Sequence, residues 1–476
     1  MFEAVSKFKK SVTLEPVIFL YVFSNYIMFA AEQGSNLMMN KICELELGYN
    51  QTTCLKRGTD FSDVEVDVQR YTNMFELRRK YIAMVPQILY TLVAGALSDS
   101  FGRKPLLFFP MLGRILGKTV HLLHLMFYHE LPIWAYYFTE LSDIMGGIPI
   151  YYMGVYGYGS NTVDQAKRAA RLARFDGVEQ VAYLTGAALS PVVFRAFGCW
   201  GSFLSGITIN IAALLILVLR TPEPIVPKEE KSIFKDANSS DTTFSKITRL
   251  FHRCVTQPLS ETKATLAKKR DHGLRTVLYL AFFNYAIYLL VLNINSLEYL
   301  YLKLVFPGFT GEDMAVYKVL TKTFVLITMF ILMPYFNGKL HWHETSILSI
   351  ISTSLVWSYF GRGIAANLIP QYYAAGLLGF LQLGLYCTNR SLITRCIDDG
   401  EIGKAFAGVS ILTAMVMAVS QPIYRHLYDA TLDVFPGSIF MVTASALAVA
   451  SLVNYFLVSK RRSIQVGRVT PTDSTE

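Results

Sequence analysis

The stretch Gly95-Ala-Leu-Ser-Asp-Ser-Phe-Gly-Arg-Lys-Pro105 decides the fold, because a long apolar run stands immediately before it. That run, Tyr81 to Leu97, approaches the roughly 20 apolar residues that a helix needs to cross a bilayer. Gly95 allows two helices to approach closely, and Gly102 allows the chain to turn tightly. We therefore expect a short turn between two membrane-spanning helices.

Three charged residues define the turn itself. Asp99 can accept hydrogen bonds from the N–H groups at a neighbouring helix N-terminus, and Arg103 and Lys104 favour the cytosolic side of a membrane. The alternative is a chance loop of this composition between ordinary spans. The pattern Gly-x-x-x-Asp-x-x-Gly-Arg-Lys between two hydrophobic helices resembles the signature of the major facilitator superfamily, the twelve-helix secondary transporters. The resemblance implies an all-α integral membrane protein built from two six-helix halves.

The composition is also typical of a membrane protein. Of 476 residues, 53% are hydrophobic and only 17% are charged, whereas an average soluble domain has about 25% charged residues. The net charge is +9, but the basic residues form short clusters beside apolar runs, which indicates membrane topology rather than a nucleic-acid polymer as partner. The six cysteines form no Cys-x-x-Cys pair, so we expect no metal site. We also find no nucleotide-binding loop, and so expect neither an ATP-driven pump nor an enzyme, and no cofactor besides a coupling proton.

Twelve apolar runs are candidates for membrane spans. The first six lie near 16–39, 80–98, 105–127, 132–156, 172–194 and 201–219, and the second six near 276–299, 318–336, 345–361, 364–388, 404–426 and 437–459. We therefore expect an N-terminal half over 1–219 with an outer loop at 40–79, a cytosolic linker over 220–275, a C-terminal half over 276–459 and a cytosolic tail over 460–476. Equal halves are typical of a duplicated transporter with its substrate site between them.

The clusters of Lys and Arg predict the orientation. With an even number of helices they fall on one side, so we expect both termini in the cytosol of a plasma-membrane or endolysosomal protein. The outer loop then carries a glycosylation acceptor, Asn50-Gln-Thr52, and two cysteines, Cys43 and Cys54. An oxidising compartment favours a Cys43–Cys54 disulfide, and two free thiols are the alternative.

Ionisable residues inside a bilayer are costly, so each one is a candidate for function. In the third span Arg114, Lys118 and His121 share one helix face, and in the fourth span Glu140 and Asp143 lie one turn apart. A short outer loop joins these spans, so Lys118 or His121 can pair with either acid. Such a group of acid, base and histidine could take up and release a proton. The alternative is an ion pair that only locks the two helices together.

Two further positions complete the candidate site. Asp176 and Glu179 share a face of the fifth span, one turn inside the membrane from a basic cluster, and are candidates for proton coupling. Arg390 lies near the inner end of the tenth span, where its planar guanidinium could bind a carboxylate or phosphate through two hydrogen bonds. The alternative for Arg390 is a cytosolic anchor of the span.

Several stretches together resemble one branch of the superfamily, the proton-coupled folate transporter family (solute carrier family 46). They are Leu14-Glu-Pro-Val-Ile-Phe-Leu20, Leu47-Gly-Tyr-Asn-Gln-Thr52, the Gly95 to Pro105 loop, and the exit of the tenth span from Arg390 to Gly403. The chain looks like a divergent, invertebrate-type member. The resemblance implies proton-coupled import of organic anions such as folates, cyclic dinucleotides or bacterial wall fragments. It implies that Arg390 takes part in proton and substrate binding, and that Asp176 takes part in proton coupling.

The chain also departs from the pattern of the folate-transporting member. Where that member has an arginine and an aspartate in the fourth helix, this chain has Glu140 and Ile148. The seventh span lacks the family's histidine, and the loop from Tyr301 to Lys318 lacks the cysteine that bridges the two halves. These departures favour an organic anion other than folate.

We therefore interpret the chain as a proton-coupled symporter of a small organic anion that works by alternating access in the lipid bilayer. Protonation of Asp176 or Glu179 would favour the outward-loaded state, and Arg390 would hold the anion. One alternative is a receptor or scaffold that uses the same fold without transport. Another is facilitated diffusion without protons, which would make both acids dispensable. The sequence carries no sign of an oligomeric state.

Overall fold

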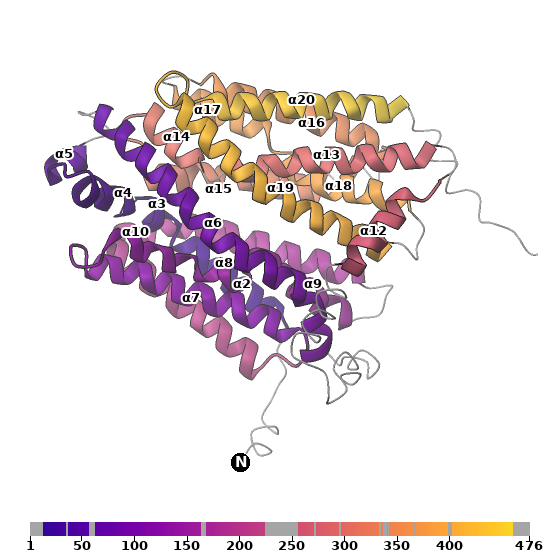
Figure 1. Ribbon diagram of the computed structural model, residues 1–476, viewed down its shortest axis with the longest axis horizontal. Coiled ribbons are helices and arrows are strands. Elements are labelled where there is room, and N and C mark those ends of the chain that lie inside the picture. Colours follow the sequence, from indigo (N-terminus) through magenta and orange to yellow (C-terminus); the bar gives the residue numbers. More distant parts are fainter. Residues whose placement is uncertain are drawn as a thin grey trace, which may run out of the picture. The chain divides into compact units, whose positions relative to one another are not determined.

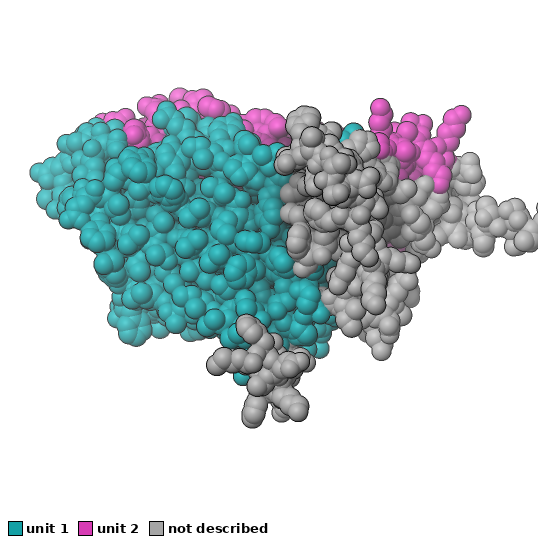
Figure 2. Space-filling model, turned by 60° about the horizontal axis from the view of Figure 1, so that its bottom comes forward, with its two compact units in different colours: residues 1–57, 74–256, 310–319 teal, residues 58–73, 257–309, 320–476 magenta. Residues whose placement is uncertain are grey.

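The computed structural model describes residues 13–34, 37–56, 62–162, 168–223, 256–270, 273–294, 297–332, 335–336, 340, 342–365, 368–397 and 402–459. Within these ranges every regular element is a helix (Figure 1). The chain divides into two compact units, which are coloured separately in Figure 2. Unit 1 comprises residues 1–57, 74–256 and 310–319, and unit 2 comprises 58–73, 257–309 and 320–476. Most of the expected linker and all of the expected tail lie outside the described residues.

Unit 1 holds the helices that precede the linker. They are α2 (Glu15–Ile27), α3 (Phe29–Gly34), α4 (Leu37–Lys41), η1 (Ile42–Glu46), α5 (Gln51–Lys56), most of α6 (Ser62–Phe101), α7 (Lys104–Met126), η2 (Ile133–Glu140), α8 (Leu141–Ile144), α9 (Gly147–Asn161) and α10 (Arg168–Leu219). The label α10 covers two helices, because Gly198 between them has a non-helical backbone with φ of 64°. These are the fifth and sixth expected spans.

Unit 2 holds the remaining helices. They are α12 (Gln257–Ala267), α13 (Leu274–Ile294), α14 (Glu298–Val305), most of α15 (Gly311–Ile327), η7 (Thr328–Leu332), α16 (Glu344–Gly363), α17 (Ile369–Leu378), α18 (Gln382–Arg395), α19 (Ile402–Thr431) and α20 (Ser438–Ser459). Helix α20 packs along α16, and α13 packs against α18, α19 and α20 (Figure 1).

Two helices are divided between the units. The first turns of α6, up to residue 73, belong to unit 2, and the first turns of α15, residues 311–319, belong to unit 1. In unit 2 Arg70 of α6 forms ion pairs with Asp429 at 3.6 Å and Asp433 at 2.7 Å. In unit 1 Glu312 of α15 forms an ion pair with Arg195. In each divided helix, ion pairs therefore bind the N-terminal turns to the unit to which those turns belong.

The outer loop is shorter than the sequence predicts. We expected a loop over 40–79 and a span over 80–98, whereas α6 runs unbroken for 40 residues from Ser62. The charges in its first half lower the local hydropathy, so composition alone does not indicate that the helix begins at Ser62. The fourth and tenth spans also differ from a single helix. The fourth is broken at Gly146 and Gly147, which both have positive φ, and the tenth is broken between Leu378 and Gln382.

Five helices among the described residues are long and apolar enough to cross a membrane by length and composition. They cover 104–126, 174–219, 274–291, 311–332 and 438–459. The segment 174–219 contains two of the expected spans. Other expected spans are broken, as in η2–α8–α9 and α17–α18, or carry charges within one long helix, as in α6.

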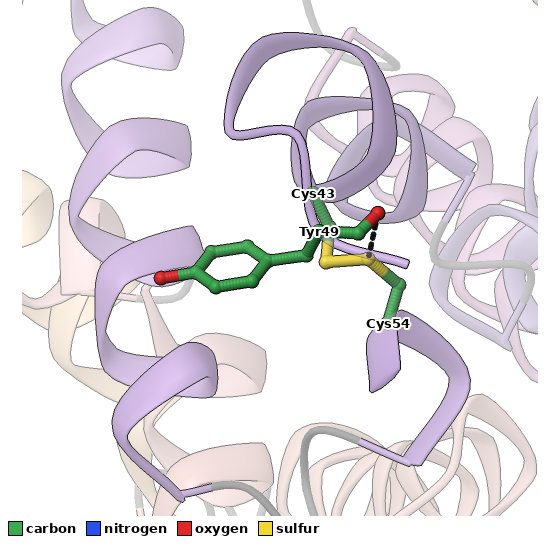
Figure 3. The surroundings of a disulfide bond; sticks show 3 residues. All are labelled: Cys43, Tyr49 and Cys54. Carbon is green, nitrogen blue, oxygen red and sulfur yellow. Dashed lines mark hydrogen bonds between the residues drawn. A yellow bond between two sulfur atoms is a disulfide. The ribbon is translucent and has the colours of Figure 1, made fainter. Parts of the chain in front are cut away.

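The expected disulfide is present. Cys43 of η1 and Cys54 of α5 are bridged, with their Cα atoms 5.9 Å apart. The Cys54 sulfur lies 3.8 Å from the Tyr49 carbonyl oxygen, while the Tyr49 ring points away from the bridge (Figure 3). Asn50, the predicted glycosylation acceptor, is exposed immediately before α5. Its glycosylation stays a prediction.

The core of unit 1 positions the candidate site. Buried apolar side chains of α2, α7, α9 and α10 form one cluster, which includes Val17, Ile18, Met111, Val155 and Phe175. Helix α2 packs along α10, and α7 packs against both α9 and α10. Polar residues on the facing sides of these four helices are therefore brought together.

Candidate functional site

Unit 1 contains a cavity of about 170 Å³ between α2, α7, α9 and α10. Three residues that the sequence analysis singled out line it: Arg114, Lys118 and Glu179. The remaining lining residues are polar, aromatic or aliphatic: Tyr21, Val22, Asn25, Tyr26, Phe29, Ile148, Tyr151 and Tyr152. The cavity thus combines two cations, one carboxyl group and several hydroxyl donors.

The two cations owe their position to a glycine pair on α7. A Cβ atom on Gly113 would lie 2.7 Å from the Leu141 carbonyl oxygen, and one on Gly117 would lie 2.5 Å from the Thr139 carbonyl oxygen. Only glycine allows the backbone of the fourth span to approach α7 this closely. Arg114 and Lys118 each follow one of these glycines, so they point away from that contact and toward the cavity.

Arg114 also acts electrostatically on groups around the cavity. Its charge influences the Tyr21 hydroxyl and the Asp143 carboxylate. Lys118 is buried, with 8% of its surface exposed. Lys118 is therefore shielded from bulk solvent, and Arg114 is half-buried beside it. A bound anion gains more from cations in such an environment than from cations in water.

The two acids of the fifth span are held by tyrosines of α9. The Tyr152 hydroxyl donates to Glu179 Oε1, and the Tyr156 hydroxyl donates to Asp176 Oδ1 at 2.8 Å. The rings of Tyr152 and Tyr156 stack with their centroids 5.7 Å apart. Neither tyrosine was predicted as a site residue from the sequence, although their spacing of four residues in a predicted helix places them on one face.

Glu140 and Asp143 form ion pairs with α6, which the sequence analysis did not predict. Lys80 Nζ lies 2.7 Å from Glu140 Oε2 and 3.0 Å from Asp143 Oδ2, and Arg79 Nε lies 3.0 Å from Glu140 Oε1. The expected partners were Lys118 and His121. Arg79 and Lys80 were missed because we placed Arg79 in a loop and Lys80 at the very edge of a span.

His121 does not make an ion pair in the described contacts. Its Nδ1 lies 3.2 Å from the Gly117 carbonyl oxygen, and its ring stacks on Phe203 with centroids 5.8 Å apart. It also meets the Tyr136 ring edge-on. These contacts pack His121 between helices, and it does not line the cavity.

Arg390 lies on α18 in unit 2, so the structure describes it separately from the cavity of unit 1. Its Nη2 donates to the Tyr285 hydroxyl at 3.1 Å, and its guanidinium also lies over the Tyr285 ring. The residue is exposed, unlike the adjacent Asn389, which is buried and donates to the Ala281 carbonyl oxygen. The aromatic partner therefore orients the guanidinium.

The loop after α6 has the predicted turn. Gly102 has a φ of 95°, a conformation that favours glycine. The backbone N–H groups of Arg103 and Lys104 at the start of α7 donate to the carboxylate of Glu223. We expected Asp99 to accept from a helix N-terminus. The side chains of Asp99 and its neighbours lie outside the described residues, whereas Glu223 supplies a carboxylate that the sequence analysis missed.

Among the residues that the structure describes, no group of three or more His, Cys, Asp or Glu is placed to hold a metal ion. The charged groups of unit 1 instead occur as cations beside acids and tyrosines. This arrangement is suited to binding a charged solute or a proton.

Residues 81–421 match the Major Facilitator Superfamily as a family, and this range is well over half of the chain. The chain belongs to the major facilitator superfamily. Its members are transporters, so the protein is a membrane transporter and not an enzyme. This agrees with the all-helical fold and the resemblance carried by the Gly95 to Pro105 loop.

Similar proteins lie in solute carrier family 46. The chain is 24% identical to the probable peptidoglycan muropeptide transporter SLC46 of Drosophila melanogaster, over 91% of this chain and 83% of that protein. It is 23% identical to the proton-coupled folate transporter of Rattus norvegicus, over 92% of this chain and 90% of that protein. The expected resemblance to solute carrier family 46 is confirmed.

A solved structure shows the same fold. The human organic anion transporter MFSD10 (TETRAN) superposes with a TM-score of 0.59 at 14% identity, over 93% of this chain and 98% of that chain. At this identity the likeness shows the architecture alone. It confirms the expected fold of the superfamily.

Proposed function

We propose that this transporter is a proton-coupled symporter of a small organic anion. The observation that carries the proposal is the cavity of unit 1, where Arg114 and Lys118 share one small space with the carboxyl group of Glu179. A proton acceptor and two anion partners therefore act on the same solute. The similarity to a proton-coupled folate transporter supports coupling to protons.

The coupling follows from the charges that line the cavity. With Glu179 ionised, the two cations and one acid leave a single positive charge. When Glu179 takes up a proton, both cations act on the solute without an opposing carboxylate. The affinity for an anion then rises, and by reciprocity a bound anion raises the affinity for the proton. Proton and anion are thus favoured together on the side where protons are abundant.

Asp176 is the second proposed proton acceptor. It lies one turn from Glu179 on α10 and is bound by Tyr156 in the same way that Glu179 is bound by Tyr152. It does not line the cavity. We assign Glu179 the direct role toward the anion and Asp176 a supporting role in proton uptake.

The chemistry of the cavity also limits the solute. Arg114 and Lys118 suit a carboxylate or a phosphate, because a charge-assisted hydrogen bond is worth about 1.5–3 kcal/mol. Ile148 lines the cavity at the position where the folate-transporting member has an aspartate. Cyclic dinucleotides and anionic muropeptides are therefore candidates beside folates. Arg390, oriented by Tyr285, is proposed as an anion partner in unit 2.

We place the transporter in the plasma membrane or an endolysosomal membrane, with both termini in the cytosol. Both membranes border a compartment that is or can be acidic, so the proton gradient would drive the anion into the cytosol. Glu140 and Asp143 are proposed to tie the fourth span to α6 through their ion pairs with Lys80. His121 is proposed to pack the third span against Tyr136 of the fourth, and none of these three residues lines the cavity.

Two uptake assays in cells that express the chain test the proposal. The probes are radiolabelled folate, a cyclic dinucleotide and a muropeptide, each measured at pH 5.5 and pH 7.4. The variants are Glu179→Gln, which mimics the protonated acid, and Lys118→Met. Glu130→Gln serves as the matched control, because Glu130 is an exposed acid beyond the end of α7. Surface expression is measured for each variant.

The proposal predicts acid-stimulated net uptake of at least one probe. Glu179→Gln should lose the acid stimulation but keep exchange of labelled for unlabelled probe, because exchange requires no release of the proton. Lys118→Met should raise the KM about tenfold, the equivalent of one lost charge-assisted contact. Uptake that is equal at both pH values and unaffected by Glu179→Gln would instead indicate a proton-independent facilitator. Binding without uptake of any probe would indicate a receptor.

A further inference from the structure

We infer that Tyr152 is a positioning residue whose hydroxyl sets the pH at which Glu179 takes up its proton, and that Tyr156 does the same for Asp176. This inference deepens the proposed function and rests on it for its role in transport. Both tyrosines then belong to the proton-binding machinery, together with the acids that they contact.

The two helices form two parallel tyrosine–carboxylate pairs, Tyr152 with Glu179 and Tyr156 with Asp176. Tyr152 and Tyr156 lie one turn apart on α9, and Asp176 and Glu179 lie about one turn apart on α10. Each hydroxyl donates to one carboxylate, and the stacking of the two tyrosine rings holds the two pairs side by side. Tyr151 packs edge-on against the Tyr152 ring, with the ring centroids 5.7 Å apart.

The hydrogen bond in each tyrosine–carboxylate pair depends on the charge of the acid. A neutral phenol donates to an ionised carboxylate, and this bond stabilises the ionised form. When the carboxyl group takes up a proton, it becomes a donor itself, so the bond must weaken or reverse. A tyrosine in this position therefore keeps the acid ionised until the pH has fallen further than it otherwise would.

Other charged and titratable groups face the same acids. Around Glu179 these are Tyr21 and Tyr26 of the first span, Arg114 and Lys118 of α7, and Tyr151 of α9. On the same helix as Asp176, the basic pair Arg171 and Arg174 forms ion pairs with Glu15. The two cations of α7 also favour the ionised acid. The tyrosine hydroxyl adds to their effect. Its contribution can be removed alone, because a Tyr→Phe substitution deletes only the hydroxyl group.

Infrared titration of the purified, reconstituted transporter tests the inference without a substrate. The carbonyl stretch of a protonated carboxyl group appears as the pH falls, and the band that Glu179→Gln removes belongs to Glu179. The test variant is Tyr152→Phe, which removes only the hydroxyl. The matched control is Tyr158→Phe on the same helix, whose hydroxyl donates to the Pro222 carbonyl oxygen at 2.9 Å and not to an acid.

We expect Tyr152→Phe to move the midpoint of the Glu179 band upward by about one pH unit, a tenfold change in the proton-binding constant. Tyr158→Phe should leave the midpoint unchanged. A midpoint that stays in place or falls in Tyr152→Phe, or a Glu179 band that never titrates, would overturn the inference. If Tyr152→Phe fails to fold, the same titration is carried out on the second pair. Asp176→Asn then identifies the Asp176 band, and Tyr156→Phe should move its midpoint upward in the same way.

The titration and the transport assay can each refute one claim without refuting the other. Uptake without any pH dependence in the wild-type chain would refute the proposed function and leave the infrared result intact. Acid-stimulated uptake that depends on Glu179, together with an unmoved midpoint in Tyr152→Phe, would refute only the role of the tyrosine.

Discussion

Arg425 of α19 and Asn73 of α6 bind each other through a reciprocal pair of hydrogen bonds. Arg425 Nη1 donates to Asn73 Oδ1 at 3.0 Å, and Asn73 Nδ2 donates to the Arg425 carbonyl oxygen at 2.8 Å. Both residues are buried, with 2% and 0% of their surface exposed. One turn away, Gln69 accepts from the Tyr428 hydroxyl at 2.9 Å. These bonds fasten the first turns of α6 into unit 2.

Asn73→Ala should therefore destabilise the fold, because it removes an acceptor from a buried guanidinium. We expect a loss of about 2 kcal/mol, within the range for a hydrogen bond to a charged group. Thermal unfolding of the purified protein in detergent measures the loss. Gln51→Ala is the control, because Gln51 is an exposed amide on α5. Equal melting temperatures for the two variants would show that the Arg425 contact contributes nothing.

Glu223→Ala should loosen the start of α7. The carboxylate accepts from the N–H groups of Arg103 and Lys104 and carries a negative charge at a helix N-terminus, which together are worth about 1 kcal/mol. Hydrogen exchange of a peptide that covers residues 102–107 should become several-fold faster in the variant. Exchange in α20, far along the chain, should stay the same. Unchanged exchange at 102–107 would contradict the role of Glu223 as a cap.

Loss of the Cys43–Cys54 disulfide should lower stability by about 2–3 kcal/mol, because the bridge closes a loop of 11 residues. Cys43→Ser with Cys54→Ser tests this in thermal unfolding, and mass spectrometry under non-reducing conditions detects the bridge in the wild-type chain. Cys199→Ser is the control, since Cys199 is a half-buried thiol of α10 that lies outside this loop. A reductant should destabilise the wild-type chain and leave the double variant unaffected.

Lys41 should make stability depend on pH. The residue is buried, its ammonium group donates to His124 Nδ1 at 3.1 Å, and burial lowers the pKa of Lys41 below its ordinary value of 10.5. The unfolded chain then holds this proton more tightly than the folded chain. Charged Lys41 therefore costs stability, and this cost grows as the pH falls from about 10.5 through the lowered pKa.

Lys41→Met removes this dependence. Its melting temperature relative to the wild-type chain should rise as the pH is lowered from 10 to 7, by the equivalent of about 1.4 kcal/mol for each unit by which burial lowers the pKa. Lys56→Met is the control, because Lys56 is an exposed lysine on α5. A difference between Lys41→Met and wild type that is constant with pH would mean that Lys41 keeps its ordinary pKa in the folded chain.

Local patterns in the sequence predicted much of this architecture. The turn at Gly102, the pairing of Cys43 with Cys54, and the shared face of Arg114 and Lys118 all depend on spacing within one or two elements. Such features can be predicted because helical periodicity and turn chemistry act over a few residues. The same holds for the face of the fifth span that Asp176 and Glu179 share.

The contacts that hold the site together could not be predicted in this way. Tyr152 meets Glu179 only because α9 packs beside α10, and Glu223 reaches the start of α7 across more than 100 residues of chain. Lys80 was assigned to the edge of a span, because its charge lowers the local hydropathy at a point where the helix continues toward Ser62. In each case the partner of the side chain depends on packing between helices that are distant in the sequence, and a local sequence pattern does not predict such packing.

Proton movement that accompanies transport tests the central claim most directly. The purified transporter is reconstituted in vesicles that contain a pH-sensitive dye, and a cyclic dinucleotide, folate or muropeptide is added outside at acidic pH. The account predicts that at least one of these anions acidifies the vesicle interior, and that Glu179→Gln abolishes the acidification while still exchanging the labelled anion. Uptake of a labelled anion with no change in internal pH would contradict proton-coupled symport.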